Sequence, residues 1–217
     1  MLRLIPEVRR GKALRLLCIG AHSDDLEIGC GGTVLTWLAS MPAVDVTWVV
    51  LSAEGMRAAE ARRSARALLA RAAASKVFIA NFRDCFMQSQ YVDVKNFFEN
   101  LKKEVDPDIV VTHWLQDRHQ DHRLAAELTW NTWRNHLVLE YEIPKYEGDL
   151  VTPNVYVPIS SSVARRKVGH LNRCFSSQRS KDWFAADTFL GLMRLRGLES
   201  RSQSGFAEAF HARKLVF

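Results

Sequence analysis

Residues 14–32, LRLLCIGAHSDDLEIGCGG, place an apolar run, a polar cluster and a glycine-rich turn in one short stretch. The continuous apolar run over 14–21 is typical of a strand that is buried on both faces, as in a parallel sheet. The glycines then lead into TVLTWLAS, which reads as a helix. A strand, a tight turn and a helix in this order indicate the start of an α/β fold.

The same alternation of strand and helix continues along the chain as far as residue 137. Each apolar or β-branched run is followed by a segment with helical propensity or helical spacing of its apolar residues. We expect strands at 44–52, 76–82 and 108–113, and helices at 57–74, 94–105 and 121–137. Such βαβ units predict a Rossmann-like, mostly parallel, doubly wound sheet that is flanked by helices.

After residue 138 the pattern changes, because two strand-like segments are separated by a turn-rich stretch and followed by two helical ones. The expected strands are 138–144 and 154–160, and the expected helices are 162–175 and 180–197. Neither a linker nor an internal repeat divides the sequence. We therefore predict a single domain over 1–217, with a Rossmann-like core at about 14–137 and a C-terminal strand and helix elaboration at about 138–217.

Charge and composition narrow the range of partners. The chain has 217 residues, is 47% hydrophobic and carries a formal net charge of +6, with many arginines in 56–76 and 194–201. These arginines are either solvated helix faces or a means of attracting an anionic ligand, such as a nucleotide sugar, a phospholipid headgroup or a nucleic acid. No nucleic-acid-binding motif is present in the sequence, so we expect no nucleic-acid partner.

Cysteine usage and hydropathy bear on the compartment. The four cysteines form no CxxC pair, which favours reduced thiols over a disulfide framework. No signal peptide is recognisable, and no apolar run approaches the roughly 18 residues of a membrane span. We expect a cytoplasmic protein without a membrane span, and a homo-oligomer is compatible with the sequence.

Two polar clusters each follow a predicted strand, AHSDD at 21–25 and THWLQDRHQDH at 112–122. The carboxyl ends of parallel strands share one edge of the sheet, where ligands bind, so the two clusters are expected to converge. Neighbouring carboxylates resist burial unless something compensates their charge. A metal ion held by histidines and aspartates would do so, and the sequence predicts a metal site at this edge.

The donor types indicate zinc, and another divalent ion remains an option. His22 and Asp25 can bind one ion from the first cluster, and His122 can supply a third ligand from the second. Asp24 is then a spare carboxylate that can act as a general base beside the metal. Spacing alone does not decide which of the two aspartates has which role.

The two clusters resemble the motifs of the PIG-L/LmbE-like de-N-acetylase superfamily. AHSDD is similar to its AHPDD motif and RHQDH to its HPDH motif. The similarity extends through EIGCGGT, MRAAEAR and VVTHWLQDRHQDH, and more weakly through the late segments SSQ and FAEAF. The resemblance covers nearly the whole chain. It implies a Rossmann-like, zinc-dependent hydrolase that removes the acetyl group from an N-acetylglucosamine-type substrate, free or linked to a nucleotide or carrier, and releases acetate.

The resemblance also implies roles for the residues that match the motifs. It makes His22, Asp25 and His122 the metal ligands, and Asp24 the general base.

Further roles follow from the same resemblance. His119 falls on the histidine that stabilises the oxyanion or donates a proton, and Asp121 on the carboxylate that orients and charges this histidine. Glu54 and Arg57 fall near residues that contact the sugar. Trp114, inside the second cluster, either stacks on a sugar face or packs inside the protein.

Two residues depart from the family motifs. Ser23 and Gln120 stand where the motifs have proline, so the loops lose rigidity, but no ligating or proton-transferring residue is lost. We expect His113 to end its strand rather than to join the metal site.

Three other functions stay open at this stage. The same site would serve a metal-dependent amidase that acts on another amide. Two histidines and a carboxylate also describe a non-haem iron oxygenase. A non-catalytic nucleotide-binding α/β module would instead use Gly29, Gly31 and Gly32 to cradle a phosphate, although glycines at this position also permit close packing of helix on strand.

Overall fold

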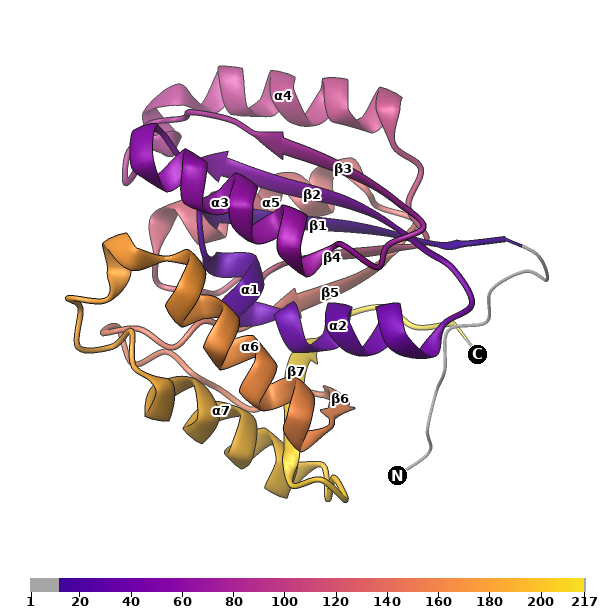
Figure 1. The fold of residues 1–217 in the computed structure, drawn as a ribbon. Helices are drawn as coiled ribbons and strands as arrows, with labels where there is room; N and C mark the ends of the chain where they lie inside the picture. The colour runs from indigo at the N-terminus through magenta and orange to yellow at the C-terminus, as the bar shows by residue number, and fades with distance from the viewer. Residues whose placement is uncertain (1–11, 217) are drawn as a thin grey trace.

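Five adjacent parallel strands form the larger part of a seven-stranded sheet in the computed structural model, which describes residues 12–216. The strands are β1 (Leu14–His22), β2 (Val44–Ser52), β3 (Ala74–Ile79), β4 (Ile109–His113), β5 (Leu137–Tyr141), β6 (Val155–Ile159) and β7 (Phe206–His211). Their order is β3-β2-β1-β4-β5-β7-β6 (Figure 1). β1 to β5 pair in parallel, and β7 and β6 continue the sheet antiparallel. The expected α/β, mostly parallel architecture is confirmed.

Helices cover both faces of this sheet (Figure 1). They are α1 (Asp25–Gly29), α2 (Gly31–Ser40), α3 (Gly55–Leu68), α4 (Tyr91–Glu104), α5 (Gln120–Thr132), α6 (Ser161–Cys174) and α7 (Ala186–Glu199), with short 3₁₀ turns η1 (Met87–Gln90) and η2 (Ser176–Gln178). Side chains of α2, α3, α6 and α7 form one apolar core with the sheet, and those of α4 and α5 form the other. None of these described helices has the length and apolarity to cross a membrane.

Burial on both faces explains the unbroken apolar run of β1. Leu16 and Cys18 belong to the core under α2 and α3, whereas Leu17 and Ile19 belong to the core under α4 and α5. All four side chains are at most 2% exposed. Complete burial of a leucine or isoleucine stabilises the fold by about 1.5–3 kcal/mol, so both faces of this strand favour apolar residues.

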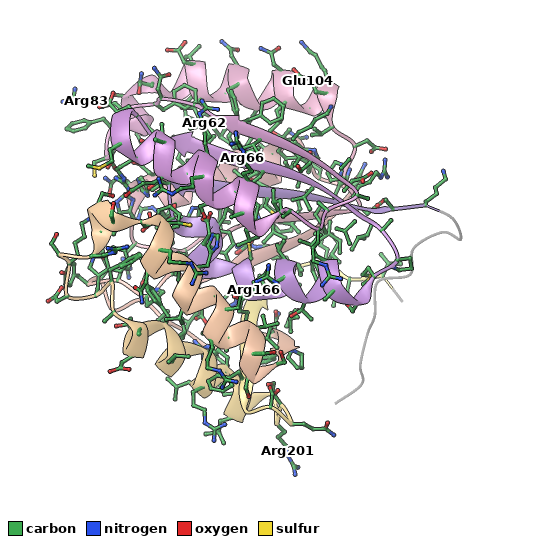
Figure 2. The ribbon with its side chains drawn as sticks, in the orientation of Figure 1. Arg62, Arg66, Arg83, Glu104, Arg166 and Arg201 are labelled. Atoms are coloured by element: carbon green, nitrogen blue, oxygen red, sulfur yellow. The ribbon has the colours of Figure 1, made fainter. Side chains whose placement is uncertain are left out.

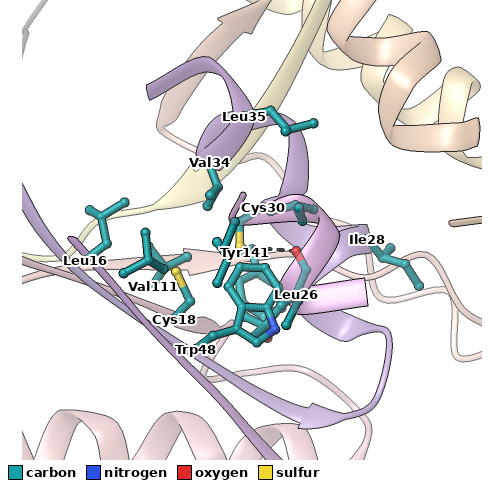
Figure 3. Packing of buried hydrophobic residues seen from close by; sticks show 14 of the residues in the cluster. Leu16, Cys18, Leu26, Ile28, Cys30, Val34, Leu35, Trp48, Val111 and Tyr141 are labelled. Atoms are coloured by element: carbon teal, nitrogen blue, oxygen red, sulfur yellow. Dashed lines mark hydrogen bonds between the residues drawn. The ribbon is translucent and has the colours of Figure 1, made fainter. Parts of the chain in front are cut away.

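The glycine-rich turn permits close packing between the first helices and the sheet. A Cβ on Gly29 would lie 2.1 Å from Cδ2 of Tyr141, whose hydroxyl donates a hydrogen bond to the Ile19 carbonyl at 2.9 Å. Figure 3 shows the Tyr141 ring packed beside Leu26 and Cys30 in this core. A larger residue at position 29 would push α1 away from β5, and with it the polar residues that begin α1.

The N-terminus of α2 is occupied by a side chain of the protein itself. The Glu208 carboxylate, from β7, accepts hydrogen bonds from the backbone N–H groups of Gly32 and Thr33 at 2.8 and 2.6 Å. Buried Lys167 of α6 lies 2.6 Å from the same carboxylate. This is the place where a nucleotide phosphate binds in many related folds, so the geometry disfavours the nucleotide-binding module.

The structure corrects several expected boundaries. The helix expected over 57–74 ends at Leu68, because the chain already enters β3 at Ala74. The helix expected over 121–137 ends at Thr132, and residue 137 begins β5. The parallel part of the sheet therefore extends to Tyr141, slightly beyond the core limit near 137. β7 was not among the expected strands.

Candidate metal centre and active site

The two polar clusters meet where the order of the strands reverses. From β1 the chain builds β2 and β3 on one side, and it then crosses to β4 and β5 on the other. His22 is the last residue of β1 and His113 the last of β4, and these strands are neighbours. Ligands of doubly wound sheets bind at such a switch point, so the convergence expected from the sequence is observed.

His22, Asp25 and His122 bring three donor atoms into a small triangle. His22 Nδ1 lies 3.2 Å from His122 Nε2 and 3.4 Å from Asp25 Oδ2, and His122 Nε2 lies 3.6 Å from Asp25 Oδ2. A tetrahedral zinc ion with bonds of about 2.0–2.1 Å keeps its ligand atoms about 3.3 Å apart. The three side chains predicted as ligands therefore fit such an ion.

Two of the three groups in this triangle, Asp25 and His122, are in the protonation state that suits a cation. Burial opposes ionisation of Asp25, but the imidazoles of His122, His113 and His22 outweigh it and hold the pKa of Asp25 well below its usual range. Burial, followed by the neighbouring His113, lowers the pKa of His122 to about 3, so this imidazole is neutral. An ionised carboxylate and a neutral imidazole are the forms that bind metal. Burial lowers the pKa of His22, but the carboxylates of Asp25, Asp121 and Asp84 outweigh burial and raise it well above its usual value, so a metal ion would have to displace a proton from His22.

Asp24 lies beside the triangle with a different environment. Burial raises its pKa to about 6, and the charge of Asp25 adds to this rise, while Arg57 and His22 oppose it. Arg57 lies 3.5 Å from Asp24 Oδ1, and Ser23 donates a hydrogen bond to the same oxygen at 3.4 Å. Asp24 Oδ2 is buried and has no hydrogen-bond partner among the described residues. One carboxylate oxygen is thus fixed and the other is free to take a proton.

His119 caps α5 at the edge of the site. Its Nδ1 accepts a hydrogen bond from the backbone N–H of Asp121 at 3.3 Å, which leaves the ring proton on Nε2. One ring nitrogen lies within 4.8 Å of ring nitrogens of both His22 and His122. Burial, followed by the charge of His22, lowers the pKa of His119, so a neutral ring is favoured.

The Asp121 carboxylate reaches a metal-ligand candidate rather than the His119 ring. Its Oδ2 lies 3.3 Å from His22 Nε2 and accepts the backbone N–H of Cys85 at 2.7 Å, and its Oδ1 accepts that of Met87 at 3.3 Å. The hydrogen bond between Asp121 and His119 is donated by the Asp121 backbone N–H. A carboxylate on the second nitrogen of a ligating histidine fixes its tautomer and orientation.

His113 lies in the site, contrary to our expectation that it merely ends β4. It is fully buried, its Nε2 lies 3.1 Å from Asp25 Oδ2, and its ring stacks on His122 at 3.9 Å between centroids. Asp117 holds the other side of His122, with 3.0 Å between Asp117 Oδ2 and His122 Nδ1. Lys145 lies 2.9 Å from Asp117. The candidate ligands are thus surrounded by groups that restrict their orientation.

The loop after β3 contributes a residue that the sequence did not single out. Asp84 Oδ1 lies 3.0 Å from His22 Nε2, and its Oδ2 accepts a hydrogen bond from Arg57 at 3.1 Å. The hydrogen bond to His22 and the charge of Arg57 hold the pKa of Asp84 well below its usual range. This residue lies outside both motifs, in the short stretch NFRDCF, and only the pairing of β3 with β2 brings it here.

The two residues that replace family prolines both have partners. The Ser23 hydroxyl accepts a hydrogen bond from Arg57 Nε at 3.1 Å, and Gln120 Nε2 donates to the carbonyl of Cys85 at 3.2 Å. Cys85 adopts a positive φ of 64°, in the left-handed region, and this turn directs its N–H at Asp121. These hydrogen bonds restrain the two loops at the positions where the family motifs have proline.

The three expected sugar-contact residues have different environments. Arg57 reaches into the site through Asp24 and Asp84. Glu54 is exposed at the N-cap of α3. Trp114 stacks on His211 of β7, with 5.1 Å between ring centroids, and lines an open cavity of about 770 Å³ together with Asp117 and Arg118. The His211 ring therefore covers one face of the Trp114 ring, as expected of a packing residue.

Solved structures with the same fold include both deacetylases and a hydratase. N,N'-diacetylchitobiose deacetylase from Pyrococcus horikoshii is 22% identical with a TM-score of 0.67, over 93% of this chain and 84% of that one. A zinc-inhibited form of teicoplanin deacetylase is 14% identical with a TM-score of 0.66, over 91% and 97% of the two chains. The 4-carboxy-2-hydroxymuconate hydratase from Pseudomonas putida is 18% identical with a TM-score of 0.69, over 94% and 98%. At these identities the likeness establishes the fold alone.

The family is established by a sequence match that covers residues 17–133. The model of the PIG-L family, described as GlcNAc-PI de-N-acetylase, matches residues 17–133, which is more than half of the chain. The match contains both motif clusters, which the structure brings together around the His22, Asp25 and His122 triangle. The chain belongs to the PIG-L/LmbE-like family of metal-dependent N-deacetylases.

Proposed function

We propose that this protein is a zinc-dependent hydrolase that removes the N-acetyl group from an amino-sugar substrate and releases acetate. The observation that carries the proposal is the triangle of His22, Asp25 and His122 beside an Asp24 carboxylate with one free oxygen. Three protein ligands with one open position are typical of catalytic zinc sites. Zinc, when bound, would polarise the acetyl carbonyl and lower the pKa of water.

Asp24 is assigned as the general base. Its free Oδ2 accepts a proton from the attacking water, and its pKa of about 6 keeps it ionised near neutral pH while leaving it basic enough to act. Arg57 and Ser23 hold the other oxygen in place. The same proton then passes to the leaving amine as the C–N bond breaks, so that acetate and a free amino sugar result.

His119 is assigned to the developing oxyanion. Because its Nδ1 accepts the Asp121 N–H, its Nε2–H is available as a hydrogen-bond donor without a charge on the ring. A fixed donor of this kind stabilises a tetrahedral intermediate because it needs no reorganisation during the reaction.

Arg57 and Asp84 are the best-placed groups for contact with a sugar. They form an ion pair across the site, and both are partly accessible. A carboxylate accepts hydrogen bonds from sugar hydroxyls, and a guanidinium donates to hydroxyl or carbonyl oxygens. Glu54 and Trp114 lack such a link to the triangle in the described contacts.

The test is acetate release from a panel of N-acetylated sugars, free and nucleotide-linked, with metal-stripped and zinc-restored protein. Zinc is restored to one equivalent, since teicoplanin deacetylase has a zinc-inhibited form. We expect release only with zinc. Lack of release from every sugar, with one zinc bound, would move the assignment to another amide substrate.

Asp24→Asn tests the base. We expect kcat to fall by about 10²–10⁴-fold with unchanged zinc content. Asp45→Asn, in β2 and outside the site, is the matched control and should retain full activity. If Asp24→Asn kept most of the turnover with zinc bound, the assignment of the base would be wrong.

A further inference from the structure

Exposed arginines are concentrated on two adjacent helices. We call Arg62, Arg63 and Arg66 of α3 and Arg165, Arg166 and Arg173 of α6 the arginine face; all six are exposed. The two helices pack against each other on the same side of the sheet. Figure 2 shows Arg62, Arg66 and Arg166 on this side of the molecule.

The positive charge of the arginine face is only slightly offset, since the charge of Arg63 acts on the Glu60 carboxylate without forming an ion pair. Residues 55–73 contain one acidic residue, Glu60, which is buried and accepts hydrogen bonds from Ser176 and Ser177. Residues 161–181 contain none. Within residues 12–216, none of the ion pairs involves a member of the arginine face.

On the opposite side of the sheet, the positive and negative charges of α4 are equal in number. α4 contains three acidic and three basic residues, and Lys95 forms an i,i+4 ion pair with Glu99 at 2.5 Å. Solubility requires charge but not its segregation to one side. The arginine face is therefore a local feature rather than a consequence of the net charge of +6.

The length of the arginine face and its guanidinium groups favour a binding partner with an extended surface of phosphate groups. Each helix has 14 residues, a length of about 21 Å, which exceeds any single small anion. Guanidinium groups suit phosphate oxygens. Neither helix contains Phe, Tyr or Trp, so aromatic stacking on unpaired bases is not available. Clusters of four to eight basic side chains on such helices bind anionic lipid headgroups electrostatically.

We propose that the arginine face binds the surface of an anionic phospholipid membrane. Arg57, in the first turn of α3, contacts Asp24 and Asp84, so α3 begins at the candidate active site and continues along the arginine face. A membrane bound there lies beside the active-site mouth. The interaction is peripheral, and it does not depend on which substrate the site cleaves.

The experiment is co-sedimentation with vesicles of phosphatidylglycerol mixed with phosphatidylcholine, and with vesicles of phosphatidylcholine alone. We expect binding only to the anionic vesicles, and loss of binding between about 0.1 M and about 1 M salt, because the Debye length falls from about 10 Å to about 3 Å. The variant R62Q/R66Q/R166Q should weaken binding on the order of 100-fold, since each arginine near the membrane contributes about fivefold.

The matched control is K76Q/K102Q/K103Q, which removes three exposed positive charges from outside the arginine face. We expect it to bind within about twofold of the unaltered protein because charges far from the contact are screened. Circular dichroism and acetate release from a soluble substrate should be unchanged in both variants. Equal weakening by both variants, or binding that ignores the lipid charge, would overturn the proposal. Preference for duplex DNA over anionic vesicles would overturn it in favour of a nucleic-acid partner.

Discussion

At the scale of single residues, two adjacent aspartates are given opposite acid–base properties by their surroundings. Asp25 is held ionised by the imidazoles around it, whereas burial raises the pKa of Asp24 to about 6. Pairs of carboxyl groups whose environments separate their pKa values are a recurring sign of divided roles. The structure thus favours Asp25 as ligand and Asp24 as base, a choice that the spacing DD left open.

Asp121→Asn distinguishes two roles for this carboxylate. The contact with His22 Nε2 predicts that the variant binds zinc about 10–100-fold more weakly, measured by competition with a chromophoric chelator. Asp84→Asn is the comparison. Its carboxylate also meets His22 but is half exposed, so we expect a smaller loss of affinity. Unchanged zinc affinity with a lower kcat would instead support the role expected from the resemblance, in which Asp121 acts on His119.

At the scale of elements, a buried ion pair joins β7 and α6 to the start of α2. Lys167 and Glu208 are both at most 4% exposed and lie 2.6 Å apart, and Glu208 caps α2. Removing one member of a buried pair leaves an uncompensated charge. The C-terminal elaboration is therefore coupled to the helix that follows the first motif.

Glu208→Gln should lower the free energy of unfolding by about 3–5 kcal/mol, measured by urea denaturation. The double variant Lys167→Met/Glu208→Gln should recover part of this loss, because it removes the unpaired ammonium group and keeps an amide oxygen at the helix cap. A single variant as stable as the unaltered protein would contradict the structural role of the pair.

The contact between α3 and α6 contains a histidine with a depressed pKa. His170 Nε2 lies 2.7 Å from the Ser64 hydroxyl, and its Nδ1 lies 4.0 Å from Cys174 Sγ. Burial lowers its pKa to about 4, and Arg173 and Arg166 add to the effect. Between pH 4 and 6.5 the unfolded state therefore binds more protons than the folded state, and stability falls as the pH falls through this range.

His170→Gln should flatten this part of the pH profile, measured as the free energy of unfolding from urea denaturation between pH 4 and 7. The difference in slope from the unaltered protein should reach about 1 kcal/mol per pH unit at most. His136→Gln, a partly exposed histidine outside this cluster, serves as control. Parallel profiles for His170→Gln and the unaltered protein would show that His170 does not contribute.

At the scale of the whole molecule, the candidate metal centre connects segments from both sides of the switch point. His22 and Asp25 come from the end of β1 and the start of α1, and His122 comes from α5 after β4. A ligand that binds only the folded state stabilises it in proportion to the logarithm of its concentration over Kd.

Removal of zinc with a chelator should therefore lower the Tm. Zinc at 100 times its Kd contributes about 2.7 kcal/mol, which corresponds to about 5–10 °C for a chain of this size. Asp24→Asn should show the same shift, because Asp24 is not among the three ligand atoms of the triangle. An unchanged Tm, with one zinc shown to bind and then to be removed, would contradict this coupling.

The sequence by itself determined the parallel part of the sheet and the two clusters that form the candidate site. The run LRLLCIGA predicts β1 because a strand covered on both faces needs apolar residues at every position. His22, Asp25 and His122 were recognisable because they lie in compact motifs that follow strands. Motifs of this kind depend on residues close together in the chain, and a sequence displays such local order directly.

Only the tertiary structure decided features that depend on distant partners. β7 has only six residues, too few for a strong periodic signal in the sequence. Its place in the sheet depends on pairing with β5 and β6, which are distant in the chain. Asp84 has no motif around it and reaches His22 only because β3 pairs with β2. The arginine face likewise exists because α3 packs beside α6, more than 90 residues away in the chain. Long-range packing places these groups together, and no local pattern of residues encodes that proximity.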